Sequence, residues 1–418
     1  MKILYMSHIL SIHDFRFLEK LSSSNHDVLL VAIDNSNIPE SISSIDGLKH
    51  IVIPRPLPKN NLKYFLSLQA IFLLIRHGIY RIIEKFSFFE SYFSEKTKIS
   101  HQEFRFFWYR EKILQIIKKF KPDVLHAGWV QLDGIVATLT DFKPILLMPW
   151  GSDILIYPFE NKIIMQQTKY AINNATHIYC DCEKVKETIL EITDLEPNHF
   201  SVFPQLGIDL SLFNPKRTKK SILKNIEWEG KRIIIMTRSF LNRIYGNKFF
   251  IMALPKILNT HPDTRVIMVG TGPDEEVIKE IVDSLDLSQF VYFTGFVPNE
   301  ELAYYLNAAE IYISTSKSDG TSLSLLEAMA CKLPVVVSDV PANCEWIQDG
   351  INGFIVPRSK VNPISDKINY LLSDKSLAEK MGKLNYNIAV EKANLDINFS
   401  KLEKTYQNLT IRNIGQTI

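Results

Sequence analysis

The sequence predicts an α/β protein with two doubly wound, Rossmann-like domains and a cleft between them. Its 418 residues exceed what one hydrophobic core ordinarily fills, so two domains are expected. Short β-rich apolar runs alternate with helical patterns, which is typical of βαβ units with a parallel sheet. The runs form two sets of six, separated by a segment with Pro204 and Pro215 at its ends and Gly207 inside it, which predicts a linker.

The predicted strands define the domain limits. The first set covers residues 3–6, 28–33, 124–126, 145–148, 177–180 and 201–203. The second covers residues 233–237, 265–269, 291–294, 311–314, 334–338 and 353–356. We therefore expect a first domain over 1–204, a linker over 205–215 and a second domain over 216–394. A C-terminal helix over about 395–418 is expected to pack back on the first domain.

Composition predicts a soluble globular protein. Apolar residues make up 46% and charged residues 22% of the chain. The net charge of +2 points to no particular partner, and no nucleic-acid partner is expected. The four cysteines are too few and too scattered for a disulfide framework, which favours free thiols in a reducing compartment. The N-terminus turns polar at Ser7 and His8, unlike a signal peptide, so a cytoplasmic location is expected.

One segment, residues 59–121, is strongly basic and aromatic. It carries 13 Lys or Arg against 5 Glu, a local excess of +8. Interleaved Phe residues allow amphipathic helices that contact an anionic membrane surface, for instance the inner face of the cell membrane. Helices packed on the sheet with solvated Lys faces are the favoured alternative.

The strongest motif follows the predicted strand at 311–314, where a loop of small residues leads directly into a helix. Main-chain amides from Gly320 through Thr321 and Ser322 to Leu323 are expected to be unpaired at the helix N-terminus, where a diphosphate binds well. Asp319 precedes the helix and Glu327 lies about two turns inside it, where its carboxylate can bind vicinal hydroxyls. The alternative is an ordinary helix cap.

Three other loops follow strands of the same half, and ligands bind at the carboxyl ends of strands in such sheets. The first loop supplies cations for a phosphate group, the second glycines that permit close backbone approach, and the third an apolar surface for a nucleobase. In that order the residues are Arg238, Arg243 and Lys248; Gly270 and Gly272; and Phe296 and Val297.

With these motifs the chain resembles the retaining glycosyltransferases of family 4, the glycosyl transferases group 1, which have the GT-B fold. The resemblance covers nearly the whole chain and is best at residues 270–273, 295–298, 318–330 and 334–338, with Glu345 and Asn352-Gly353 beyond them. It implies a nucleoside diphosphate sugar as donor, UDP-linked before GDP-linked, no permanently bound cofactor and no metal.

The resemblance also assigns roles to the residues of the second half. In the family, two Glu residues flank the donor. The second, which binds the ribose, corresponds to Glu327, and the first, which meets the transferred sugar, is replaced here by Asp319. The family's phosphate-binding Arg corresponds to Arg238, and its Lys corresponds by spacing to Arg243, with Lys248 as the competing candidate.

The first half resembles the family less closely, as acceptor domains usually do. Asp153 is the only ionisable group in the loop where a His or Asp of the family lies near the reacting centre, and Trp150 stands where His is common. His126 is a candidate acceptor ligand, with a buried histidine as the alternative. The family's glycine pair after the first strand is absent, and His13 stands in that loop as a further acceptor candidate.

The resemblance implies a retaining, metal-independent glycosyltransferase that moves a hexosyl or N-acetylhexosaminyl group to a hydroxyl of a glycan or lipid-linked acceptor, as in polysaccharide biosynthesis. Two alternatives remain open at this point. One is a sugar-nucleotide epimerase of the same fold, and the other is a catalytically weak sugar-nucleotide-binding subunit.

Overall fold

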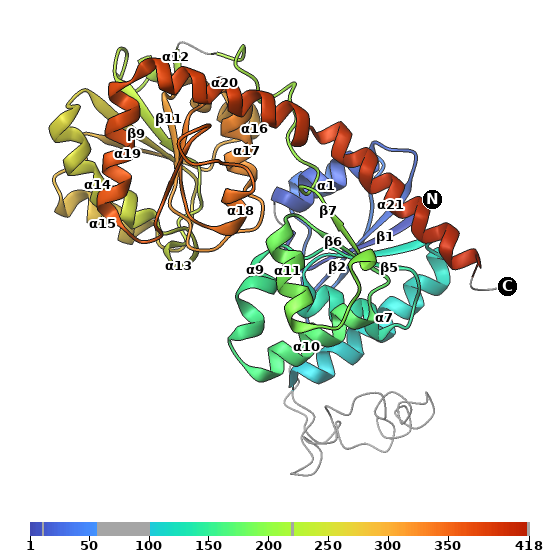
Figure 1. Cartoon of the computed structure of the whole chain (residues 1–418). Helices are drawn as coiled ribbons and strands as arrows, with labels where there is room; N and C mark the ends of the chain where they lie inside the picture. Colours follow the sequence, from blue (N-terminus) through green and yellow to red (C-terminus); the bar gives the residue numbers. More distant parts are fainter. Residues whose placement is uncertain (11, 57–100, 219–220, 416–418) are drawn as a thin grey trace. The chain divides into compact units, whose positions relative to one another are not determined.

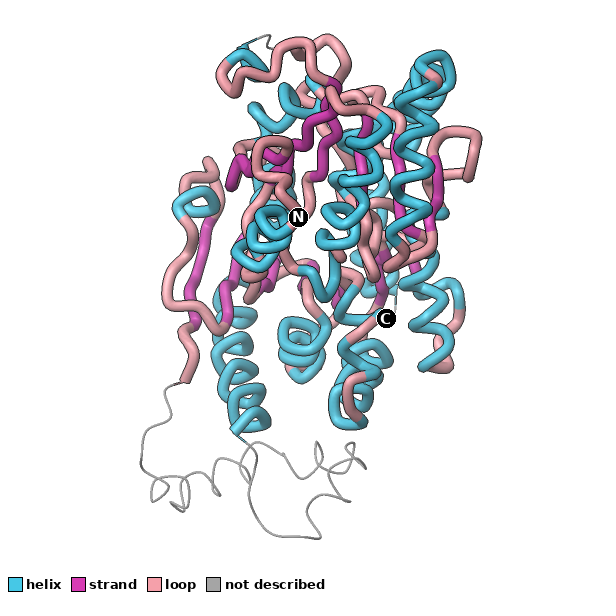
Figure 2. Tube along the Cα trace, turned by 90° about the vertical axis from the view of Figure 1, so that its left-hand side faces the viewer, coloured by secondary structure: helices cyan, strands magenta, loops and turns pink. Residues whose placement is uncertain are grey.

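The computed structural model describes residues 1–10, 12–56, 101–218 and 221–415. Contacts between Cα atoms divide the chain into two units. The first unit comprises Met1–Pro149, Tyr157–Ile178 and Leu409–Ile418, and the second comprises Trp150–Ile156 and Tyr179–Asn408. The domain limits at residues 204 and 216 stay a prediction. Strands and helices alternate along both units, as Figures 1 and 2 show.

The first sheet has seven strands in the order β3-β2-β1-β4-β5-β6-β7. The pairings from β3 through β6 are parallel. The strands are β1 (Lys2–Ser7), β2 (Asp27–Ile33), β3 (Lys49–Ile53), β4 (Val124–Ala127), β5 (Ile145–Leu147), β6 (His177–Cys180) and β7 (Phe200–Val202).

The second sheet has six parallel strands in the order β10-β9-β8-β11-β12-β13. The strands are β8 (Arg232–Met236), β9 (Thr264–Val269), β10 (Val291–Gly295), β11 (Ile311–Ser314), β12 (Val335–Ser338) and β13 (Phe354–Val356). The two doubly wound parallel sheets confirm the predicted fold class.

All twelve predicted strands are present, but β3 was not predicted. Its first three residues are exposed, and only Ile53 at its end is buried. Because an edge strand with Lys49 and His50 lacks the apolar run of a central strand, the pattern that identified the others does not mark it.

The helices begin and end at the following residues: α1 (Ile12–Ser22), α2 (Glu40–Ser43), α7 (His101–Phe120), η1 (Val130–Gly134), α8 (Ile135–Leu139), α9 (Ser152–Leu155), η2 (Tyr157–Phe159), α10 (Lys162–Asn174), α11 (Glu183–Ile192), η3 (Pro197–His199), α12 (Ser221–Lys224), α13 (Asn242–Tyr245), α14 (Asn247–Thr260), α15 (Glu275–Ser284), α16 (Asn299–Ala308), α17 (Leu323–Ala330), α18 (Pro341–Cys344), α19 (Val361–Ser373), α20 (Lys375–Lys392) and α21 (Leu395–Gly415). Side chains cap α10, α17, α20 and α21, where Asn161, Ser322, Asp374 and Asn394 each accept a hydrogen bond from a main-chain amide of the first turn.

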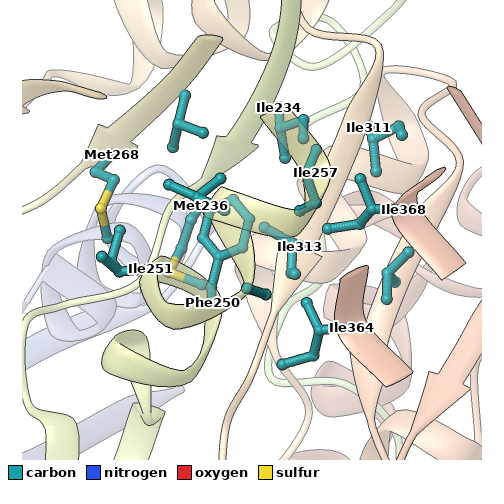
Figure 3. Packing of buried hydrophobic residues seen from close by; sticks show 14 of the residues in the cluster. Ile234, Met236, Phe250, Ile251, Ile257, Met268, Ile311, Ile313, Ile364 and Ile368 are labelled. Atoms are coloured by element: carbon teal, nitrogen blue, oxygen red, sulfur yellow. The ribbon is translucent and has the colours of Figure 1, made fainter. Parts of the chain in front are cut away.

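Helices cover both faces of the second sheet. Alternate residues of β8 point to opposite faces, so Ile234 and Met236 pack with α14, α15 and α19, whereas Ile233 and Ile235 pack with α16 and α17. Figure 1 shows these two groups of helices on either side of β9 and β11, and Figure 3 shows the first cluster at close range. A sheet buried on both faces accounts for the continuous apolar runs in its strands.

Each sheet contains a point where the strand order reverses. In the first sheet this point lies between β1 and β4, and in the second it lies between β8 and β11. Loops that leave the carboxyl ends of such strand pairs diverge to opposite faces, and the resulting crevice is the usual place for a ligand in open α/β sheets.

The basic segment over 59–121 falls largely outside the described residues. Its described part includes α7, where Tyr109 and Ile113 are fully buried and Phe106 nearly so. Arg105 and the Tyr109 hydroxyl bind the Asp34 carboxylate at 2.6 and 2.7 Å. This part of the segment packs against α8 and the end of β2. Within the described part of the chain, no helix has the length and apolar character needed to cross a bilayer.

Candidate functional site

Arg238 lies at the reversal point of the second sheet, just after β8, and only 8% of it is exposed. Its Nη1 donates hydrogen bonds to the hydroxyls of Ser322 and Ser324 at 2.7 and 2.8 Å, and its Nη2 donates to Asp319 Oδ2. Ser322 is the residue that caps α17. The guanidinium group therefore joins the end of β8 to the loop and helix that follow β11.

Two tyrosines complete the surroundings of Arg238. The guanidinium carbon lies 4.2 Å from the centroid of the Tyr245 ring, within the range of a cation–π interaction. The Tyr312 hydroxyl donates to Ser324 Oγ at 3.0 Å. Neither tyrosine nor Ser324 was predicted as a site residue. Of these three residues, only Ser324 had a sequence signal, because it lies inside the motif, two residues after the capping Ser322.

Arg238 keeps one hydrogen-bond donor unused. Its Nε is buried and has no partner among the described residues. Burial lowers the pKa of Arg238, but Asp319, followed by Tyr245, Tyr312 and Glu327, outweighs burial and raises it. A buried, fully charged guanidinium with an unpaired N–H is the donor set that an anionic oxygen would satisfy.

The two predicted carboxylates have different surroundings. Burial raises the pKa of Asp319, while the charge and hydrogen bond of Arg238 oppose that shift. Glu327 is 3% exposed and lies on α17, within the second unit. The two carboxylates are thus both held at the same loop and helix, one paired with the guanidinium and one buried in the helix.

The main-chain amides at the start of α17 are not all unpaired, and that expectation is wrong at Thr321. Within the second unit, the Thr321 amide donates to Asp181 Oδ2 at 2.8 Å. Asp181 is 6% exposed, and burial raises its pKa to about 6, although the Thr321 amide opposes this. The Asp181 carboxylate thus binds an amide that was expected to meet a diphosphate. The two residues are 140 positions apart in the sequence, so no local motif predicts this contact.

The two predicted glycines bring the loops after β8 and β9 together. A Cβ added to Gly272 would lie 2.5 Å from the Phe240 carbonyl oxygen, and Gly270 has a φ of +133°. The Phe240 amide also donates to the Thr271 carbonyl at 3.1 Å. Only glycine fits these positions, so the glycines shape the loops beside Arg238.

The other predicted donor-site residues lie on α13, on α14 and in the loop after β10. Arg243 is exposed on α13, and Lys248 is half-buried on α14 with its Nζ 5.3 Å from the Phe249 ring centroid. Phe296 is 67% exposed, and Val297 packs against the core that contains α16 and α17. An exposed Phe296 remains available as the predicted apolar surface.

The acceptor candidates are placed differently from what their positions suggested. His126 lies within β4, is fully buried, and has its ring 5.1 Å from those of Tyr5 and Phe17. Burial lowers the pKa of His126 to about 3. These surroundings are those of the buried alternative, because a neutral core histidine cannot reach a dissolved acceptor.

The remaining candidates include Asp153, which is fully buried at the start of α9 and accepts a hydrogen bond from the Trp150 amide at 2.8 Å. Trp150 is half-buried, and contacts assign it and Asp153 to the second unit. His13 lies on α1, and its side chain is outside the described part of the structure. Asp153 therefore stabilises its own turn, whatever further role it has.

Two family profiles match the chain. Residues 218–387 match the glycosyl transferases group 1, and residues 86–182 match the glycosyl transferase 4-like group. Among curated proteins, the chain is 29% identical over 183 residues to a GDP-mannose-dependent alpha-(1-6)-phosphatidylinositol monomannoside mannosyltransferase from Mycolicibacterium smegmatis, covering 42% of this chain and 48% of that protein. It is 26% identical over 223 residues to the putative teichuronic acid biosynthesis glycosyltransferase TuaC from Bacillus subtilis. That alignment covers 52% of this chain and 54% of TuaC.

Solved structures match over almost the full chain. The Anabaena protein HepE, in complex with UDP, superposes with a TM-score of 0.74 at 15% identity, covering 98% of this chain and 100% of that one. Sucrose-phosphate synthase from Thermosynechococcus elongatus superposes with a TM-score of 0.74 at 16% identity, covering 99% of this chain and 100% of that one. At these identities the likeness shows the fold. The aligned part spans between a third and about half of the length of the first curated relatives.

Proposed function

The chain belongs to the family 4 glycosyltransferases with the GT-B fold, and from that premise we propose that it transfers a sugar from a nucleoside diphosphate sugar to a hydroxyl of a glycan or lipid-linked acceptor. The group 1 profile lies on the unit that holds Arg238. HepE, which has the same fold, has been solved with UDP and with UDP-glucose.

The observation that carries the proposal is the buried guanidinium of Arg238 with its unpaired Nε. We place the donor diphosphate against this group and the capping hydroxyl of Ser322. Asp319 is an anionic partner of Arg238, so a bound diphosphate would share or replace that partner. Glu327 is proposed to bind the ribose hydroxyls, and Asp319 the hydroxyls of the transferred sugar.

The chemistry requires stabilisation of a departing diphosphate. Fixed cations and a helix terminus provide this without reorganisation, which supports a metal-independent reaction. Arg243 or Lys248 is proposed as the second cation. In a retaining reaction the acceptor hydroxyl attacks from the side of the leaving group, and its proton passes to the departing phosphate oxygen. UDP is the proposed nucleotide, with GDP as the alternative that the mycolicibacterial relative supports.

Calorimetry with UDP and GDP tests the donor site directly. We expect the wild-type chain to bind one of the two, and Glu327→Gln to weaken that binding at least about tenfold, since a buried hydrogen-bond partner to a ligand hydroxyl is lost. Glu300→Gln, an exposed carboxylate on α16, is the matched control and should bind like the wild type. Equal affinity of Glu327→Gln and the control contradicts the assignment.

Product analysis addresses the remaining alternatives. A sugar-nucleotide epimerase converts the donor without any acceptor, whereas a transferase releases nucleoside diphosphate.

Contact of residues 59–121 with an anionic membrane is a separate proposal, supported by the excess of basic residues. Flotation with vesicles of anionic and of zwitterionic lipid tests it, because electrostatic binding should be confined to the anionic vesicles.

A further inference from the structure

A histidine and an aspartate meet at the reversal point of the first sheet. His8 follows β1, and Asp133 lies in η1 after β4, the neighbouring strand. The distance from His8 Nδ1 to Asp133 Oδ2 is 2.9 Å, and the His8 amide lies 3.4 Å from the same oxygen. Both residues belong to the first unit, and neither takes part in the donor site.

One carboxylate oxygen of Asp133 binds His8, whereas the other has no hydrogen-bond partner among the described residues. Asp133 is fully buried, and the oxygen without a described partner is Oδ1. The His8 side chain is 23% exposed. Because Nδ1 faces a carboxylate, it carries a proton, and Nε2 is the ring atom left for another group. A buried carboxylate costs free energy unless it is paired, and the pairing of Asp133 with His8 fixes the orientation of the imidazole.

The main chain and the rings around His8 fix its position. Asn35 Nδ2 donates to the His8 carbonyl at 2.8 Å and to the Ile33 carbonyl at 2.9 Å. The Trp129 ring centroid lies 6.2 Å from that of His8 and 5.3 Å from that of Tyr157, edge to face in both cases. Both aromatic side chains are half-buried. The oriented imidazole thus lies beside the partly exposed Trp129 ring, and the Tyr157 ring packs on Trp129.

A sugar ring requires these two kinds of partner. Its C–H faces pack on aromatic rings, and its hydroxyls need oriented hydrogen-bond donors or acceptors. We propose that His8, oriented by Asp133 and lying beside Trp129, which in turn contacts Tyr157, binds a saccharide ring of the acceptor through one of its hydroxyls. The inference rests on the proposed transferase function and names the acceptor side of it. His8 is a binding residue here, and Asp133 is a positioning residue.

The electrostatics of the pair agree with this role. Burial lowers the pKa of His8, but the charge and hydrogen bond of Asp133, with the charges of Asp34 and Asp14, outweigh burial and raise it. Burial raises the pKa of Asp133, against the effect of His8. A hydroxyl suits either state of His8, because it donates to neutral Nε2 and accepts from protonated Nε2.

Titration of the isotope-labelled full chain with D-glucose, D-mannose and N-acetyl-D-glucosamine, each with saturating UDP, tests the inference by NMR. The His8 ring and Trp129 indole signals are assigned by their loss in His8→Gln and Trp129→Phe. We expect at least one sugar to shift both signals in a saturable way. His8→Gln should weaken that sugar at least tenfold, and Trp129→Phe should weaken it while leaving the ion pair intact. His50→Gln, an exposed histidine on β3, should have no effect.

The inference is overturned if none of the three sugars shifts either signal, or if the variants bind sugar like the wild type. Repeating the titration without UDP separates this result from the donor assignment. Sugar binding at His8 in a chain that does not bind UDP would support the inference and contradict the donor site. UDP binding without any shift at His8 would support the donor site and contradict the inference.

Discussion

Replacement of Arg238 by glutamine separates a ligand-binding role from a structural one. The substitution removes a buried positive charge and leaves Asp319, of which 15% of the side chain is exposed, without its partner. Three hydrogen bonds are lost, to Ser322, Ser324 and Asp319. Arg232→Gln is the matched control, because Arg232 begins β8, whose other end precedes Arg238, and binds Glu310 in a more exposed pair.

The structure sets the expected magnitudes. Breaking a buried ion pair costs about 3–5 kcal/mol, and partial exposure of Asp319 reduces this, so we expect Arg238→Gln to lower the free energy of unfolding by about 2 kcal/mol. Arg232→Gln should cost less than about 1 kcal/mol. Removing a buried charged group from a ligand interface costs about 2–5 kcal/mol of binding free energy, so UDP should bind at least about 30-fold more weakly.

Urea unfolding and UDP calorimetry on the two variants decide between the roles. The binding measurement must be made where Arg238→Gln is still folded, which its unfolding curve establishes. An unfolding free energy lowered as expected together with a UDP affinity within twofold of the wild type would refute the reasoning. Arg238 would then be a structural partner of Asp319 alone.

Three further outcomes are expected. Gly272→Ala should lower the free energy of unfolding by about 1–3 kcal/mol, because its Cβ would meet the main-chain oxygen of Phe240 at 2.5 Å; urea curves that coincide with the wild type would contradict this. Asp133→Asn should lower the pKa of His8, since it removes the charge that raises it and leaves burial, which lowers it; an unchanged NMR titration of the ring would disprove the coupling. Asp319→Asn should tighten UDP binding severalfold in calorimetry, as its guanidinium partner is released, and weaker binding would show that the two anions do not compete.

The fold class could be predicted from the sequence, and the sequence also indicated the region that we propose as the donor site. Parallel strands buried on both faces must be apolar throughout, which made twelve of them visible. Ligands bind where such strands end, and that rule selected Arg238 after β8 and the loop before α17. The edge strand β3 was not predicted, because Lys49 and His50 are exposed and interrupt the apolar pattern.

The side chains that surround Arg238 and His8 could be identified only from the folded chain. The sheet order brings β8 beside β11 and β1 beside β4, so Asp319 meets Arg238 and Asp133 meets His8 across 81 and 125 positions of sequence. It also buried His126, which its position at a strand end had suggested as an acceptor ligand. Periodicity records which face of an element is apolar. Which polar groups share a crevice depends on the order of the strands and on the packing of the helices between them.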